Sequence, residues 1–275
     1  MRRTQIRYEG MLAFMNKEDI KKLAENKNFI PGIYNYCDRW CERCALTARC
    51  MNFAMTREYS DDPEASDINN EKFWQSLSEI FKVTREMLQE SAEEMGIDLD
   101  SIDYEEASRD EAVKDKIAKN HECCRAAQKY YQMVDDFFET EYIPSLQVVD
   151  RSEEKRAPEL KNINPPAGPT TLDELVEIIY WYHHFIYVKL MRAVRGALGN
   201  TPDELEDFPK DSDGSAKVAL IAIDRSMAAW GAIYDHFPSH RDQILAIIKH
   251  LEGLRQRVEK VFPQARNFIR PGFDE

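Results

Sequence analysis

Residues 172–198 read LDELVEIIYWYHHFIYVKLMRAVRGAL, and this stretch decides the fold class more than any other. Its apolar side chains recur at intervals of three and four residues, which is the spacing of one face of an α-helix. From Glu174 to His184 it is apolar almost all round, so we expect this helix to lie at the centre of the protein. Thr171 or Asp173 is suited to cap its N-terminus, and Gly199 is suited to end it.

Helical periodicity extends from this stretch through most of the chain, and no convincing alternating strand is present. The other predicted helices span residues 17–26, 71–94, 105–142, 216–236 and 239–262. Long polar connections are predicted at residues 151–170 and 201–215. This pattern predicts an all-α fold in which residues 1–275 form a single helical bundle. Residues 151–170 are an alternative domain boundary, but the helices on either side are each too apolar to stand alone.

Charge and apolar content limit the partners and the location that we expect. The chain has 275 residues, of which 43% are apolar, and a formal net charge of −13. It can therefore bury a sizeable core, whereas nucleic acid and anionic membrane surfaces would repel it. No window is apolar enough to span a bilayer and residues 1–20 lack a secretory signal, so we expect a cytoplasmic protein. A protein or redox partner stays open, and the sequence does not indicate an oligomeric state.

A segment at residues 30–56 contains four of the six cysteines. Cys37, Cys41, Cys44 and Cys50 are separated by three, two and five residues. Cytoplasmic thiols stay reduced, so this grouping indicates ligands rather than a disulfide framework. Four thiolates complete a tetrahedral zinc site or the ligand set of a [4Fe–4S] cluster. A structural zinc ribbon needs a second short Cys pair, which this segment lacks, so a [4Fe–4S] cluster is the favoured cofactor and zinc the alternative.

The run CERCALTARC at residues 41–50 also resembles the cysteine cluster that staples a [4Fe–4S] centre in RecB-family nucleases. The resemblance implies a type of cluster. It does not imply nuclease activity, because those nucleases have their first ligand far away in the sequence. Their Asp…Glu-x-Lys active-site strands are not visible in this chain either.

A different interpretation treats these cysteines as small apolar side chains. On a continuous helix Cys37, Cys41 and Cys44 share one face, and Cys50 points to the opposite side. A four-thiolate site therefore requires the helix to break or unwind between Cys44 and Cys50. Without that break, we expect a helical interaction or scaffold protein whose cysteines pack or sense oxidants.

A second group of candidate residues lies in the predicted helix at 105–142. His121, Cys123 and Cys124 could add ligands to the first site or act as redox thiols. More ordinary roles for the same residues are a buried cysteine and a hydrogen-bonded histidine.

A third group could make the protein a bundle enzyme with a carboxylate–histidine metal site. Its residues are Glu177, His184 and Asp224. Ferritin-like di-iron proteins carry Glu-x-x-His pairs, and no such pair occurs in this sequence. A buried Asp224 paired with Arg192 or Arg195 explains the same residues more simply.

Overall fold

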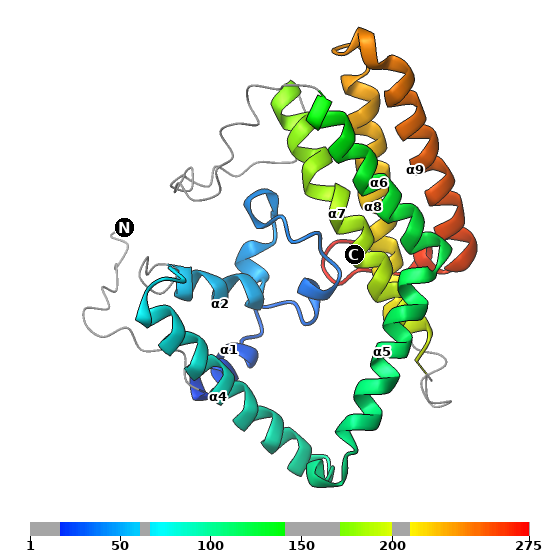
Figure 1. Cartoon of the computed structure of the whole chain (residues 1–275). Helices are drawn as coiled ribbons and strands as arrows, with labels where there is room; N and C mark the ends of the chain where they lie inside the picture. The colour runs from blue at the N-terminus through cyan, green and yellow to red at the C-terminus, as the bar shows by residue number, and fades with distance from the viewer. Residues whose placement is uncertain (1–16, 61–66, 141–170, 200–209, 275) are drawn as a thin grey trace, which may run out of the picture. The chain divides into compact units, whose positions relative to one another are not determined.

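The structure, a computed structural model, describes residues 17–60, 67–140, 171–199 and 210–274. Every regular element among these residues is helical, which confirms the predicted all-α fold. The α-helices (Figure 1) are α1 (Lys17–Ala24), α2 (Met51–Ser60), α4 (Glu71–Glu94), α5 (Tyr104–Asn120), α6 (Glu122–Thr140), α7 (Leu172–Ala197), α8 (Asp211–Ile233) and α9 (Arg241–Val261). None of these helices is long and apolar enough to cross a bilayer.

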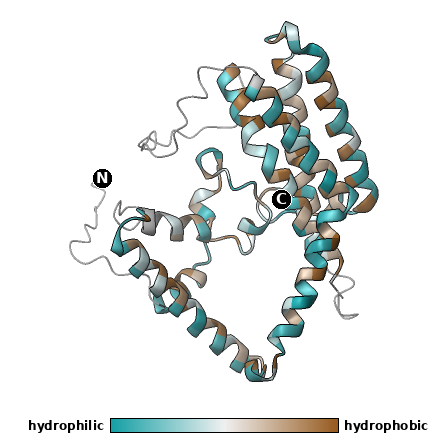
Figure 2. Ribbon diagram, in the orientation of Figure 1, coloured by the Kyte–Doolittle hydropathy of each residue, from teal (hydrophilic) through white to brown (hydrophobic). Residues whose placement is uncertain are grey.

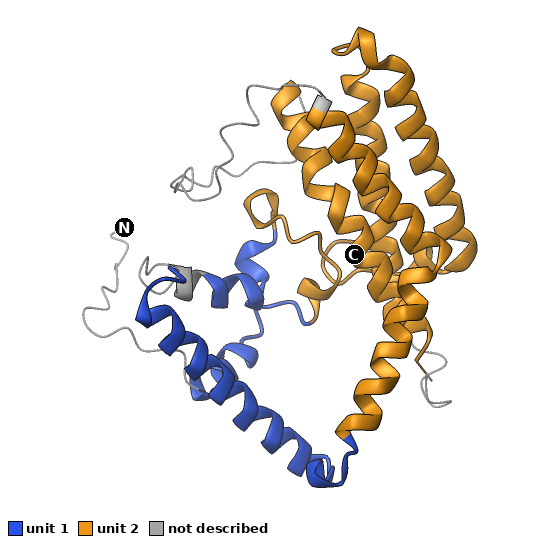
Figure 3. Cartoon of the chain, in the orientation of Figure 1, with its two compact units in different colours: residues 1–31, 46–103 blue, residues 32–45, 104–275 orange. Residues whose placement is uncertain are grey.

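The chain divides into two compact units, which Figure 3 colours separately. The smaller unit comprises residues 1–31 and 46–103, and the larger comprises residues 32–45 and 104–275. The sequence favours one domain, with residues 151–170 as the alternative boundary. The two units divide near residues 31, 45 and 103, and residues 151–170 lie outside the described part of the chain.

A helical bundle forms the core of the larger unit, as predicted. Helix α7 packs against α5, α6 and α8, and α9 closes the bundle against α8 and α6. Apolar residues recur along each of these helices between polar ones (Figure 2). Ile186 and Leu190 of α7 are fully buried. So is Trp230 of α8, which donates a hydrogen bond to the hydroxyl of Tyr130 in α6 at 3.1 Å.

Of the two caps that the sequence allows for α7, Thr171 and Asp173, the structure shows Thr171 at the N-cap. The Thr171 hydroxyl accepts a hydrogen bond from the backbone N–H of Glu174 at 3.3 Å. In return, the Glu174 carboxylate accepts one from the backbone N–H of Thr171, also at 3.3 Å. This reciprocal capping box satisfies two backbone donors that the first turn of a helix leaves without partners.

Two predicted boundaries in the larger unit are wrong. The single helix expected at 105–142 is two helices, because α5 ends at Asn120 and α6 begins at Glu122. The connection expected at 201–215 is also too long, because α8 already begins at Asp211. Asp211 and Asp213 occupy the first turn of α8, where negative charge favours a helix N-terminus.

In the smaller unit, α4 spans residues 71–94 as predicted. The Asn70 side chain accepts a hydrogen bond from the backbone N–H of Lys72 at 3.0 Å and caps the helix. Gly96 follows its end with φ of 68°, a left-handed conformation that glycine adopts without strain. Lys17 and Lys21 of α1 both pair with Glu90 of α4, which fixes α1 to this helix.

Candidate functional site: the cysteine segment

The backbone between Cys37 and Cys50 is not a continuous helix. Cys41 begins a single 3₁₀ turn (Cys41–Arg43), and Cys44 ends it in an extended conformation with φ of −88° and ψ of 121°. A second 3₁₀ turn (Thr47–Arg49) ends at Cys50, also extended, directly before α2. The shared helical face expected for the first three cysteines is therefore wrong. The break that a four-thiolate site requires between Cys44 and Cys50 is present.

All four thiols of the segment are half-buried, and none forms a disulfide. Cys37, Cys41 and Cys44 belong to the larger unit and Cys50 to the smaller one. The Cys37 thiol lies 3.6 Å from the carbonyl oxygen of Tyr34, to which it donates a hydrogen bond. Within the described residues, no three His, Cys, Asp or Glu side chains form a group that could hold a metal ion. The four cysteines are thus partly exposed as residues but are not assembled as a ligand set.

Asp38 anchors the segment to the helical bundle of the same unit. Its carboxylate accepts hydrogen bonds from the Tyr182 hydroxyl at 2.7 Å and from Nη1 of Arg225 at 2.6 Å. Its backbone carbonyl accepts a third from Nε1 of Trp181 at 3.0 Å. Burial, followed by the charge of Asp38, raises the pKa of Tyr182, so this phenol stays a hydrogen-bond donor. Asp38 therefore fixes the backbone directly beside Cys37.

Trp40 supplies an apolar anchor to the same helices. Only 6% of its surface is exposed, and its ring stacks on Trp181 at a centroid distance of 4.8 Å. The guanidinium of Arg43 lies 4.1 Å from the centroid of the Trp40 ring and also pairs with Glu177 of α7. Trp40 is thus a core aromatic residue that holds residues 37–44 against α7.

Two cations of α7, Lys189 and Arg192, contact the backbone at Asn35, two residues before the first cysteine. Lys189 is buried, and its ammonium donates a hydrogen bond to the carbonyl oxygen of Asn35 at 3.2 Å. Burial, followed by the nearby Arg192, lowers the pKa of Lys189 to about 8. Cys37 is among the groups that interact electrostatically with Lys189. The sequence does not single out Lys189, because a lysine in a helix normally extends to solvent.

The second cysteine group, His121 with Cys123 and Cys124, lies at the N-terminus of α6. Cys123 and Cys124 are fully buried, and burial raises the pKa of their thiols to about 11 and about 12. Thiols that stay protonated at neutral pH are poor nucleophiles. Nδ1 of His121 accepts a hydrogen bond from the backbone N–H of Cys123 at 3.2 Å, so His121 caps α6. Burial and helix capping are the roles that the structure shows for these residues, and their use as extra ligands or redox thiols stays a prediction.

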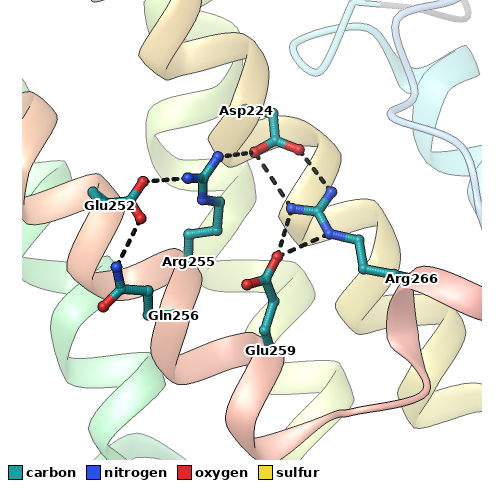
Figure 4. Close-up of polar contacts among 6 residues, drawn as sticks. All are labelled: Asp224, Glu252, Arg255, Gln256, Glu259 and Arg266. Atoms are coloured by element: carbon teal, nitrogen blue, oxygen red, sulfur yellow. Dashed lines mark hydrogen bonds and ion pairs between the residues drawn. The ribbon is translucent and has the colours of Figure 1, made fainter.

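The third group does not come together as a metal site either. Asp224 of α8 accepts hydrogen bonds from Arg255 at 3.4 Å and Arg266 at 2.7 Å (Figure 4). Glu252 and Glu259 pair with the same two arginines. This half-exposed network ties the residues after α9 to α8. The Asp224 carboxylate oxygens, which the predicted metal site would need as ligands, accept these hydrogen bonds instead.

The expected partners of Asp224 are also different. Arg192 pairs with Asp211 and Arg195 pairs with Glu111, so the predicted pairing of Asp224 with either arginine is wrong. Glu177 pairs with Arg43, and the His184 ring packs edge-on against Tyr131 at a centroid distance of 5.6 Å. Glu177, His184 and Asp224 therefore have separate structural partners.

Comparisons with protein-family models, with curated proteins and with solved structures found no match to this chain.

Proposed function

We propose that Cys37, Cys41, Cys44 and Cys50 bind a [4Fe–4S] cluster, in a helical protein that transfers electrons or senses redox state. The observation that carries this proposal is the unwound backbone of the segment. Each of Cys41, Cys44 and Cys50 lies at an end of a 3₁₀ turn rather than inside a helix. Such a winding peptide can direct successive thiolates toward irons that lie at different corners of one cluster.

The chemistry of the donor set fits this cofactor. Four soft thiolates within residues 37–50 match the ligand number and type of a [4Fe–4S] cluster. All four cysteine residues are half-buried, and none is engaged in a disulfide. Asp38 and Trp40 hold the chain between the first two cysteines against α7.

The test is anaerobic purification followed by absorption spectroscopy and iron and sulfide analysis. We expect a broad absorption band at about 400 nm, and about four irons and four sulfides per chain. Replacing Cys41 or Cys50 with serine should abolish the band. Replacing the buried Cys124 with alanine is the matched control and should retain it. A folded, colourless protein without iron would overturn the proposal, and bound zinc instead of iron would replace the cluster with a zinc site.

A second candidate function is oxidant sensing by the same thiols in a helical interaction protein. It is favoured by the absence of an assembled metal group among the described residues and by the half-buried thiols. It predicts that peroxide treatment forms a disulfide within residues 37–50, with no metal in the untreated protein. Peptide mapping under non-reducing conditions distinguishes it from the cluster, whose thiols are protected while iron is bound.

A further inference from the structure

Helix α4 has two opposite faces, and among the described residues only one of them is packed. Its inner face consists of Ser76 and Val83, which are buried, and Glu90, which pairs with two lysines of α1. Val83 and Ala92 are the only buried apolar side chains among the described residues of the smaller unit. Because burial of apolar surface is the main source of stability, this unit gains little from its own core. Covering its remaining apolar side chains would therefore stabilise it.

The opposite face of α4 is a stripe of large apolar side chains spaced seven residues apart. They are Trp74, Phe81, Leu88 and Met95, with exposed fractions of 54, 66, 64 and 68%, and we call them the outer stripe. Trp74, Phe81 and Leu88 each precede a residue of the inner face by two positions, which is about 200° round a helix. Seven residues are two helical turns to within about 20°, and this is the spacing at which helices pair in a coiled coil. The outer stripe is therefore arranged to meet another helix along its length.

The exposed area of the outer stripe is close to what a dimer needs. An aromatic side chain has about 150–250 Å² of surface, so Trp74 and Phe81 each present about 100–150 Å². With Leu88 and Met95 the stripe presents about 400–500 Å² per chain, the size of patch that often marks an interaction site. Pairing two copies would bury about 1,000 Å² from these side chains alone, and stable interfaces bury about 1,200–2,000 Å² in total. Flanking side chains such as Ile80, which is 37% exposed, would add to this area.

The charges of α4 favour a second copy in antiparallel orientation. Residues 71–82 contain two lysines and two glutamates and have no net charge, whereas residues 83–94 contain one arginine and four glutamates and have a net charge of −3. Parallel pairing would place the two acidic halves side by side, and like charges repel. Antiparallel pairing places each acidic half beside a neutral half and also opposes the two helix dipoles.

The sizes of the side chains favour the same orientation. The outer stripe is aromatic in its first half, at Trp74 and Phe81, and aliphatic in its second half, at Leu88 and Met95. Antiparallel pairing about the centre of the stripe matches each ring with a smaller side chain, as well-packed helix interfaces do. Nε1 of Trp74 already donates a hydrogen bond to the carbonyl oxygen of Ile68 at 2.9 Å. A partner can therefore cover the Trp74 ring without leaving its polar group unpaired.

We propose that the outer stripe of α4 is a homodimer interface, in which α4 helices of two copies of the chain pair in antiparallel orientation. Phe81 packs against the partner's Leu88, and Trp74 packs against the partner's Met95. The paired helices supply the smaller unit with the apolar core that its own described residues lack. The dimer does not depend on a metal or a cofactor.

The test is sedimentation equilibrium of the full-length chain in reducing buffer, so that association through cysteines is not scored. We expect a species of twice the chain mass of 32.1 kDa. Phe81→Lys and Leu88→Lys should each raise the dissociation constant of the dimer about 10-fold or more. Both side chains are exposed, so circular dichroism should show unchanged helix content. Leu245→Lys is the matched control, because Leu245 is 49% exposed on α9 of the larger unit, and this variant should remain dimeric.

A charge-pair variant tests the orientation. Antiparallel pairing brings position 81 of one chain to position 88 of the other, so Phe81→Lys/Leu88→Glu places opposite charges together across the interface. This double variant should dimerise more tightly than Phe81→Lys or Leu88→Glu alone, and the gain should shrink at high salt. Parallel pairing would instead bring like charges together. A double variant that dimerises no better than the single variants would overturn the antiparallel arrangement.

Two other outcomes would overturn the interface itself. One is a wild type that stays monomeric at about 100 µM, well above the dissociation constant of a micromolar dimer. If deletion of residues 1–16 then produced a dimer, the stripe would be covered by the chain's own N-terminal residues. The other is a wild-type dimer that neither Phe81→Lys nor Leu88→Lys weakens, which would place the interface elsewhere.

Discussion

Removing the Asp38 carboxylate should weaken the attachment of the cysteine segment to the bundle, and its energetic effect can be worked out from two contacts. The Tyr182 hydroxyl is 1% exposed and donates to Asp38 at 2.7 Å, a hydrogen bond to an ionised group worth about 1.5–3 kcal/mol. Arg225 is about half exposed, so its pair with Asp38 adds only about 0–1 kcal/mol. We therefore expect Asp38→Ala to lower the free energy of unfolding by about 2–3 kcal/mol.

A double-mutant cycle isolates the contact with Tyr182. Asp38→Ala, Tyr182→Phe and the double variant are compared by urea denaturation followed by circular dichroism. We expect a coupling free energy of about 1–2 kcal/mol between the two positions. Glu42→Ala removes an exposed carboxylate from the same segment and should change stability by less than about 0.5 kcal/mol. Additive effects of the two single substitutions would refute the anchoring role of Asp38.

Three further predictions concern other parts of the larger unit. Cys123 and Cys124 should resist a thiol reagent in the folded protein at pH 8 and react only in denaturant. Burial raises the pKa values of these thiols to about 11 and about 12. The free energy of unfolding should therefore fall as pH rises above about 9, where the thiols of the unfolded chain ionise. Gly214→Ala should lower the free energy of unfolding by about 1–3 kcal/mol, because a Cβ atom would lie 2.7 Å from the Phe268 ring. An unchanged melting temperature would contradict this packing. Hydrogen bonds from Arg270 and then from Lys217 lower the pKa of Asp274. The Asp274→Asn variant should therefore have a lower free energy of unfolding than wild type at pH 7. This difference should disappear as pH falls well below about 4, where the carboxyl group of wild type also becomes neutral.

Helices with strong amphipathic patterns and clear end signals could be predicted from the sequence. The bounds of α4 follow from the polar residue before it and the glycine after it, and α7 begins at the predicted cap Thr171. The break at His121 could not be predicted, because the apolar stripe continues across it and the capping hydrogen bond leaves no periodic signal. The early start of α8 was missed because its first turn is polar, a composition that suits both a connection and a helix N-terminus.

In the cysteine segment, residue spacing predicted which side chains group together but not the conformation of the backbone. The spacing identifies the four thiols as a group, but helical periodicity is a poor guide to single 3₁₀ turns, whose length is too short for an apolar face to repeat. The contacts of Asp38 and Lys189 could not be predicted either. They join the segment to α7 and α8 across more than a hundred residues of chain, and their types alone suggest solvent-exposed side chains.

The most direct test of the four-cysteine cluster is native mass spectrometry of the anaerobically purified chain. We predict a species heavier than the polypeptide by about 350 Da, the mass of four irons and four sulfides. The same species should be absent from a variant in which Cys37, Cys41, Cys44 and Cys50 are all serine. A wild-type protein that is folded and has only the polypeptide mass under these conditions would contradict the proposal.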